Sequence, residues 1–215
     1  MKKYIREPLN AMTHLVAAVL SVLGFLILLS ALKHEFTFIK LISVMAFSIG
    51  LVGLYSASAI YHSWQGTKER IKELERIDHM WIYVLIAGSY TPICLVTLKG
   101  WVGTVLLCVV WSLTILGIVL KKVWFNAPRW ISTIFYLLLG WTAIIVIYPL
   151  YKSFSMEAML LLVLGGLAYS IGALFYGFKS KYMRIWVFGY HEIFHVFTML
   201  GSLCHFSLIY KFVIL

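Results

Sequence analysis

The chain has 215 residues, of which 62% are hydrophobic and 12% charged, and its formal net charge is +10. An ordinary globular domain is about 45–50% apolar and about 25% charged. A soluble fold of this size could not bury so much apolar surface. The composition therefore indicates an integral membrane protein, with lipid as its solvent.

Seven apolar stretches are each about as long as the roughly 20 residues that a helix needs to cross a bilayer. In chain order they are residues 11–32, 41–61, 80–98, 101–120, 130–150, 158–178 and 185–210. The stretches are continuous, whereas the strands of a membrane β-barrel would alternate apolar and polar residues over about ten positions. We therefore predict an all-α polytopic membrane protein, a single seven-helix domain over residues 1–215 with short loops.

The basic residues predict how this domain is oriented. Five of the 18 Lys and Arg residues lie on one side of the predicted helices, and 13 lie in the N-terminal tail and in the second, fourth and sixth loops. Cytoplasmic loops carry the Lys/Arg excess, so we expect the N-terminus in the cytoplasm and the C-terminus outside. The positive charge then reflects orientation in a cell membrane and contact with anionic lipids, and not nucleic-acid binding.

Two of the eight acidic residues lie where a charge is costly. Five are expected to be solvated in tails and loops: Glu7, Glu35, Glu69, Glu73 and Glu75. Glu157 opens the sixth predicted helix. Asp78, the only Asp of the chain, starts the third predicted helix, and Glu192 lies inside the seventh. An ionisable group at such depth costs roughly 2.5 kcal/mol or more unless it is paired, so both suggest function.

Histidines accumulate in the same region. His62 ends the second predicted helix, which runs towards the cytoplasm, while His191 and His195 lie early in the seventh, which runs away from it. These histidines and Asp78 should therefore meet at the inner leaflet. Positions four apart share a helix face, so His191 and His195 could bind one metal ion with His62 as the third ligand.

Three imidazoles with an open fourth position are typical of a catalytic zinc site, although imidazole also suits copper, iron and nickel. Asp78 would supply counter-charge and accept a hydrogen bond from the bound water. The alternative is a set of interhelical hydrogen bonds without metal. His205 lies about 21 Å beyond His191 along the same helix and cannot bind the same ion. For His14 and His79 we expect hydrogen-bonding roles.

Two further side chains could take part in chemistry. The pattern His191-Glu192-x-x-His195 is also that of zinc proteases, in which the Glu is the general base. Glu192 could equally support a ligand or pair with a loop Lys. Ser58 lies one turn before His62 on the same face and could hold the water or polarise a carbonyl. A small residue there would equally allow close helix packing.

Four groups of residues together resemble a known family. They are Glu7-Pro8-Leu9-Asn10 with Thr13-His14, Ser58-Ala59-Ile60-Tyr61-His62, Asp78-His79 with Gly88-Ser89-Tyr90-Thr91-Pro92, and His191-Glu192-Ile193-Phe194-His195 through His205-Phe206. The chain resembles the bacterial hemolysin III proteins of the progestin and adipoQ receptor family. The resemblance implies seven helices with the N-terminus inside.

The resemblance also implies a site. In the adiponectin-receptor branch, the positions matching His62, His191 and His195 bind zinc, and the one matching Asp78 holds the zinc-bound water. That branch and the related alkaline ceramidases look like lipid amide hydrolases. Those receptors carry Gln where this chain has Glu192, which favours Asp78 as the base.

Two hypotheses of function follow. In the first, the protein is a zinc-dependent hydrolase that cleaves an amide or ester bond of a membrane lipid at the inner leaflet, with Asp78 moving the proton and Ser58 assisting. In the second, it is a membrane sensor, receptor-like or cytolytic protein with a structural zinc. An open fourth ligand position facing a lipid-accessible cavity would favour the enzyme, and a fourth protein ligand would favour the sensor.

Overall fold

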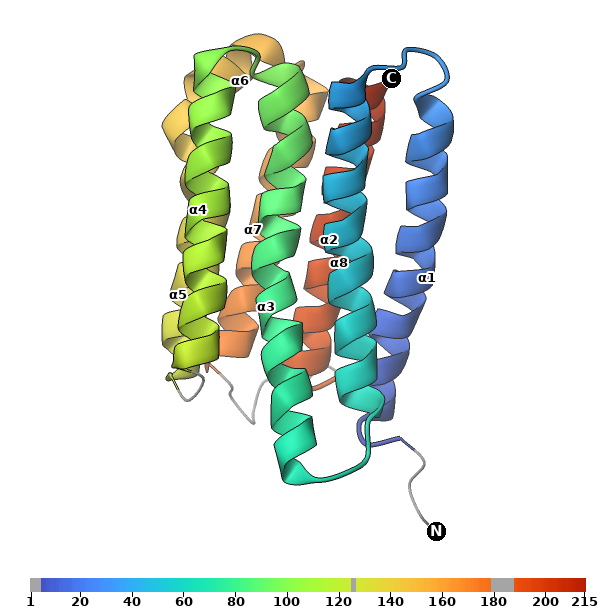
Figure 1. The fold of residues 1–215 in the computed structure, drawn as a ribbon, viewed down its shortest axis with the longest axis vertical. Helices are drawn as coiled ribbons and strands as arrows, with labels where there is room; N and C mark the ends of the chain where they lie inside the picture. The colour runs from blue at the N-terminus through green and yellow to red at the C-terminus, as the bar shows by residue number, and fades with distance from the viewer. Residues whose placement is uncertain (1–4, 125–126, 179–187) are drawn as a thin grey trace.

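A computed structural model describes residues 5–124, 127–178 and 188–215 as a bundle of helices (Figure 1). Seven segments of the described chain are long and apolar enough to cross a membrane. They are α1 (Pro8–Ala31), α2 (Phe38–Ser63), α3 (Lys68–Pro92) with the π-helix η1 (Ile93–Thr97), α4 (Trp101–Val123), α5 (Arg129–Gly140) with the 3-10 helix η2 (Trp141–Val146) and α6 (Ile147–Ser153), α7 (Met156–Phe178), and α8 (Tyr190–Ile209) with the π-helix η3 (Tyr210–Ile214). The predicted all-α, seven-helix membrane fold is confirmed.

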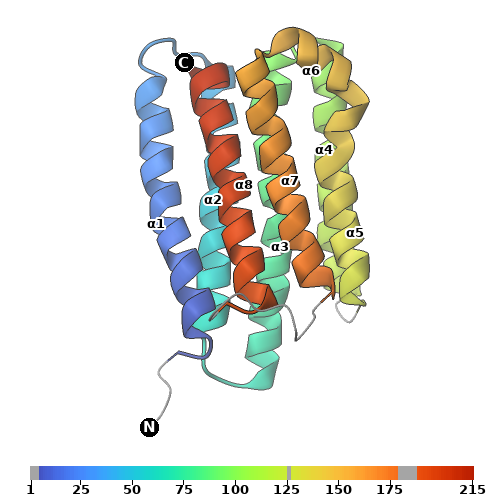
Figure 2. The same ribbon diagram turned by 180° about the vertical axis from the view of Figure 1, so that it is seen from behind.

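The helices form two layers. In Figure 1, α2, α3 and α4 stand in front of α8, α7 and α5, with α1 at one edge, and Figure 2 shows the same arrangement from behind. α1 packs against both α2 and α8, and α7 packs along α8. The chain termini lie at opposite ends of the bundle (Figure 1), called here the N-terminal and C-terminal ends. Which end faces the cytoplasm stays a prediction from the basic residues.

The third helix begins 12 residues before the predicted boundary at position 80. Its first two turns are rich in Lys, Glu and Arg, which are strong helix formers although they are not apolar. Thr67 caps this helix, because its side chain accepts a hydrogen bond from the backbone N–H of Arg70 at 3.3 Å. Glu69, Glu73 and Glu75 therefore lie on a helix that extends beyond the bundle (Figure 1), and not in a loop. The predicted start of the last helix, at 185, falls outside the described residues.

The fifth span is interrupted in its middle by the 3-10 helix η2. A 3-10 segment has poorer hydrogen bonds than an α-helix, and hydrocarbon offers no water to satisfy the groups it frees. Tyr90 of α3 supplies these partners. Its hydroxyl donates to the Gly140 carbonyl at 2.6 Å and accepts from the Ala143 N–H at 2.8 Å and from the Thr142 hydroxyl at 3.1 Å. One buried phenol therefore holds the irregular turn against the core.

Lys40 stabilises the C-terminal end of the bundle by hydrogen bonds between helices, as Tyr90 does in the middle. Its ammonium group donates to the Glu35 carboxylate at 2.6 Å and to the Ile214 carbonyl at 2.9 Å, so that it joins α2 to η3. The hydrogen bond from Lys40 lowers the pKa of the Glu35 carboxyl. Glu35 is exposed, as expected, and it is also paired.

We predict that Tyr90→Phe destabilises the protein by about 1–3 kcal/mol, because it leaves the Gly140 carbonyl and the Ala143 N–H without a partner in a water-free region. Thermal unfolding in detergent measures the change. Tyr148→Phe is the matched control, since Tyr148 is 64% exposed on the same span. Equal melting temperatures for the two variants would contradict the role given to Tyr90.

Candidate metal centre

Three histidines meet at the N-terminal end of the bundle. His62 lies in the last turn of α2, and His191 and His195 lie in the first turns of α8. Each of the three offers a ligand atom, and these atoms lie within 4.8 Å of one another. His62 and His195 are both 1% exposed. Residues more than 120 positions apart in the sequence therefore form one buried imidazole cluster.

The spacing of the cluster suits a small metal ion. Nε2 of His62 and Nε2 of His191 are 3.2 Å apart. A tetrahedral zinc ion at about 2.0–2.1 Å from each nitrogen separates two ligand atoms by about 3.3–3.4 Å. Two of the three imidazoles are thus at ligand spacing already, and the third ring lies 4.7 Å from that of His191 between centroids.

Hydrogen bonds behind two of the rings set which nitrogen faces the cluster. The Glu7 carboxylate lies 2.5 Å from Nδ1 of His62, which leaves Nε2 as the free nitrogen. The Thr13 hydroxyl donates to the Asn10 carbonyl, so it can only accept at 3.1 Å from Nδ1 of His195. Metal-binding histidines usually donate their second N–H to such a carboxylate or hydroxyl oxygen, which fixes the ring. The residues present therefore fit a metal ion.

Besides Thr13, Glu7 is a residue of this site to which the sequence analysis gave no role. It was expected to be solvated, but its side chain is only 40% exposed and is bonded to His62, and its backbone N–H donates to the His62 carbonyl at 3.0 Å. The hydrogen bond with His62 holds the pKa of the Glu7 carboxyl at about 2, against the effect of partial burial. Glu7 is therefore a carboxylate at neutral pH and brings negative charge to the cluster.

Asp78 and Ser58 lie beside the cluster on one wall of an internal cavity. Asp78 is 7% exposed and Ser58 is 1% exposed, and both line this cavity together with His191. The Ser58 hydroxyl is within hydrogen-bonding reach of the Asp78 carboxylate. A carboxylate, a hydroxyl and an imidazole from α3, α2 and α8 thus face the same space.

Glu192 serves the helix rather than the cavity. Its carboxylate accepts a hydrogen bond from the backbone N–H of Gly189 at 2.9 Å, which caps the start of α8. A negative charge at this position also suits the positive end of the helix dipole. Of the three roles that the sequence left open for Glu192, the geometry does not favour the general base.

His14 and His79 lie near the histidine cluster and make different kinds of contact. Nε2 of His79 lies 3.0 Å from the Tyr176 hydroxyl, which is the expected hydrogen-bonding role. His14 differs from the expectation: its ring stacks on that of His195 at 3.5 Å between centroids, and neither of its nitrogens has a hydrogen-bond partner among the described residues. His14 therefore holds the His195 ring by stacking.

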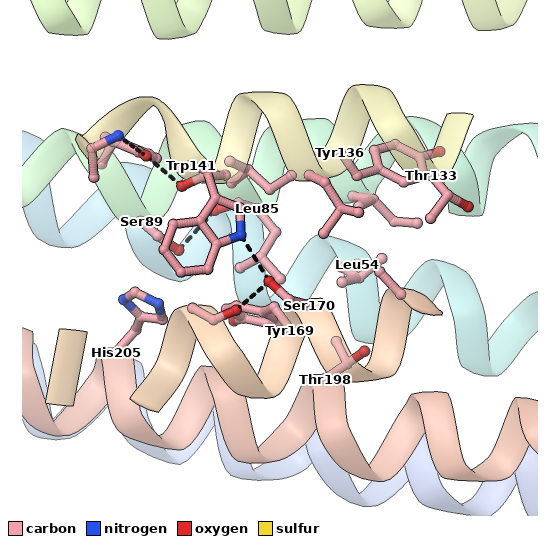
Figure 3. A pocket seen from close by; sticks show the side chains of 18 of the residues that line it. Leu54, Leu85, Ser89, Thr133, Tyr136, Trp141, Tyr169, Ser170, Thr198 and His205 are labelled. Carbon is pink, nitrogen blue, oxygen red and sulfur yellow. Dashed lines mark hydrogen bonds between the residues drawn. The ribbon is translucent and has the colours of Figure 1, made fainter. Parts of the chain in front are cut away.

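The cavity runs from this cluster towards the C-terminal end of the bundle. Its middle is lined mostly by apolar side chains of α3, α5 and α7, and Figure 3 shows part of this lining. Four lining residues also have 36–56% of their surface exposed: Trp141, Ile144, Ile147 and Val163. The cavity is therefore least covered between η2, α6 and α7.

The fold and the cluster define a class: a multi-pass helical membrane protein with three histidines at one end of an internal apolar cavity. Comparison with known proteins gives the family. The chain belongs to the Haemolysin-III related family, whose model matches residues 2–206.

Individual relatives agree with this assignment. A protein named hemolysin-3 homolog from Bacillus subtilis is 39% identical over 197 residues, which cover 91% of this chain and 89% of the relative. Hemolysin-3 of Bacillus cereus is 35% identical, with 94% and 90% covered. The human monocyte to macrophage differentiation factor is 24% identical, with 94% and 82% covered. The predicted family resemblance is confirmed.

We predict that Glu7→Ala weakens zinc binding about 10–100-fold, because His62 loses the carboxylate that orients its ring. Competition with a chelator of known affinity, on purified protein in detergent, measures the change. Glu35→Ala is the control, since Glu35 lies in the loop at the opposite end and pairs with Lys40. A zinc affinity unchanged by Glu7→Ala would show that Glu7 does not support the metal site.

Proposed function

We propose that the protein is a zinc-dependent hydrolase that cleaves an amide or ester bond of a membrane lipid. The observation that carries the proposal is the position of the three-histidine cluster: it lies at the end of an apolar cavity, next to the buried pair of Asp78 and Ser58. A cluster that only joined helices would need neither an adjoining cavity nor a carboxylate beside it.

Three imidazoles leave a fourth ligand position, and His191 is the member of the cluster that lines the cavity. Zinc held in this way would polarise a carbonyl and lower the pKa of a bound water to about 7. Imidazole nitrogens are borderline ligands, so copper, iron and nickel are alternatives to zinc. The carboxylates of Glu7 and Asp78 would offset the charge of a dication in a poorly polarisable surrounding.

Asp78 is proposed as the group that moves the proton. It would take a proton from the attacking water and return it to the leaving amine or alcohol, as a general base and then a general acid. The Ser58 hydroxyl would donate a hydrogen bond either to Asp78, which orients the carboxylate, or to the developing oxyanion. Both side chains are buried, so bulk water would not compete for them.

The substrate class follows from the lining of the cavity. Apolar side chains between η2, α6 and α7 suit an acyl chain, and the cavity is least covered there, which would let a lipid enter sideways from the membrane. The scissile carbonyl would then sit at the histidine end. The alternative is a sensor, receptor-like or cytolytic protein in which zinc is structural, and a wild-type protein that hydrolyses no lipid would favour it.

We predict that Asp78→Asn keeps the fold and the zinc but lowers turnover about 10²–10⁴-fold, because an amide can hydrogen-bond water but cannot take its proton. Release of fatty acid from a panel of ceramides and phospholipids measures turnover, and zinc content is measured on the same samples. The control is Glu192→Gln, which keeps a capping side chain at α8 and should keep activity.

Two outcomes would contradict this assignment. A fully active Asp78→Asn beside an inactive Glu192→Gln would make Glu192 the base, as in zinc proteases. Loss of zinc from Asp78→Asn would instead make Asp78 a structural counter-charge.

A further inference from the structure

The cavity has a second polar end, far from the histidine cluster. His205 lines it on α8, and Tyr169 of α7 lines it beside His205 (Figure 3). The two rings stack at 5.5 Å between centroids. His205 is only 8% exposed, and its Nδ1 has no hydrogen-bond partner among the described residues.

The helix packing holds this imidazole in place. A Cβ at Gly165 would lie 2.7 Å from Nε2 and Cδ2 of His205, so α7 can approach the ring only because that position is glycine. Tyr169, one turn further along α7, covers the face of the ring. The imidazole is thus fixed between two positions of α7.

A group of three hydroxyls lies near the preceding turn of α8. Ser202 lies one turn before His205 on α8, and its hydroxyl is 2.8 Å from that of Tyr169 and 2.5 Å from that of Tyr55. These three hydroxyl groups satisfy one another. A buried polar group without a partner costs roughly 1–3 kcal/mol, and His205 is the member of this cluster whose hydrogen-bonding capacity is left unused.

The distance between the two polar ends of the cavity determines how long a ligand must be to reach both. His205 lies 10 residues beyond His195 and 14 beyond His191, or about 15–21 Å along α8. An extended chain advances about 1.2 Å per bond, so a group held at the cluster and a group held at His205 are about 12–17 bonds apart. Between them the cavity is lined by apolar side chains such as Leu54 and Leu85 (Figure 3).

We propose that His205, held in place by Tyr169, forms a subsite that recognises a hydrogen-bonding oxygen in the middle of an acyl chain, about 12–17 carbons from the carbonyl. The preferred ligand class is therefore a mid-chain hydroxylated or keto acyl lipid. The inference rests on the proposed function only in that the carbonyl end is held at the histidine cluster.

Binding of three free acids to the purified, zinc-loaded protein in detergent tests the subsite by calorimetry. The probes are octadecanoic acid, 12-hydroxyoctadecanoic acid and 2-hydroxyoctadecanoic acid. We expect the 12-hydroxy acid to bind roughly two- to tenfold more tightly than the other two, the value of one hydrogen bond. The 2-hydroxy acid has the same polarity but carries its hydroxyl at the wrong end.

Variants assign the preference to His205. His205→Phe keeps a ring to stack on Tyr169 and should bind octadecanoic acid normally while losing the preference for the 12-hydroxy acid. His205→Asn keeps a hydrogen-bonding group and should retain part of it, and His34→Phe, an exposed loop position, should change nothing. Equal affinity for the three acids, or a preference that survives His205→Phe, overturns the subsite. Because binding and not turnover is measured, either result is distinct from a failure of the hydrolase proposal.

Discussion

Hydrocarbon offers no hydrogen-bond partners, so every polar group inside this bundle must find its partner in the protein. This constraint accounts for the contacts that hold the fold. Tyr90 satisfies the irregular turn at η2, Lys40 holds the end of η3, and the hydroxyl groups of Tyr55, Tyr169 and Ser202 satisfy one another. The same constraint makes an unpartnered polar group informative. Among the described residues that line the cavity, such groups occur at His14, His79 and His205.

The proposed chemistry depends on the same separation of polar and apolar regions. Glu7 lies at hydrogen-bonding distance from Nδ1 of His62, and Thr13 at hydrogen-bonding distance from Nδ1 of His195. The other ring nitrogen of each histidine is therefore free to face the common point of the cluster. Asp78 and Ser58 add a base and a hydroxyl from two other helices. A lipid carbonyl brought to this end would meet these groups away from bulk water, while its chain would occupy the apolar part of the cavity.

Much of the fold followed from the sequence, because hydropathy records directly what lies in lipid. Hydropathy gave the wrong start for the third helix, because α3 begins at Lys68 in a charged segment where helix propensity and the cap at Thr67 form the helix. In the sequence, only Gly140 indicated that the fifth helix would be interrupted at η2. It depends on Tyr90, which lies 50 residues away, and no local pattern reports such a contact.

The histidine cluster could be placed from the sequence, because alternating helix directions bring His62, Asp78, His191 and His195 to one end. Glu7 was missed, since hydropathy treats a residue before the first helix as solvated. Pro8, at the first position of α1, was a usable signal that Glu7 starts that helix. The capping role of Glu192 was missed because the predicted helix began at 185, whereas α8 begins at Tyr190 and makes Glu192 its third residue.

The central claim is that the three histidines bind one metal ion. The direct measurement is the zinc content of the purified protein, compared among the wild type, His62→Ala, His191→Ala, His195→Ala and the loop variant His34→Ala. The account predicts about one zinc per chain in the wild type and in His34→Ala, and loss of zinc in the other three. If those three variants all retained both metal and stability, the account would be contradicted.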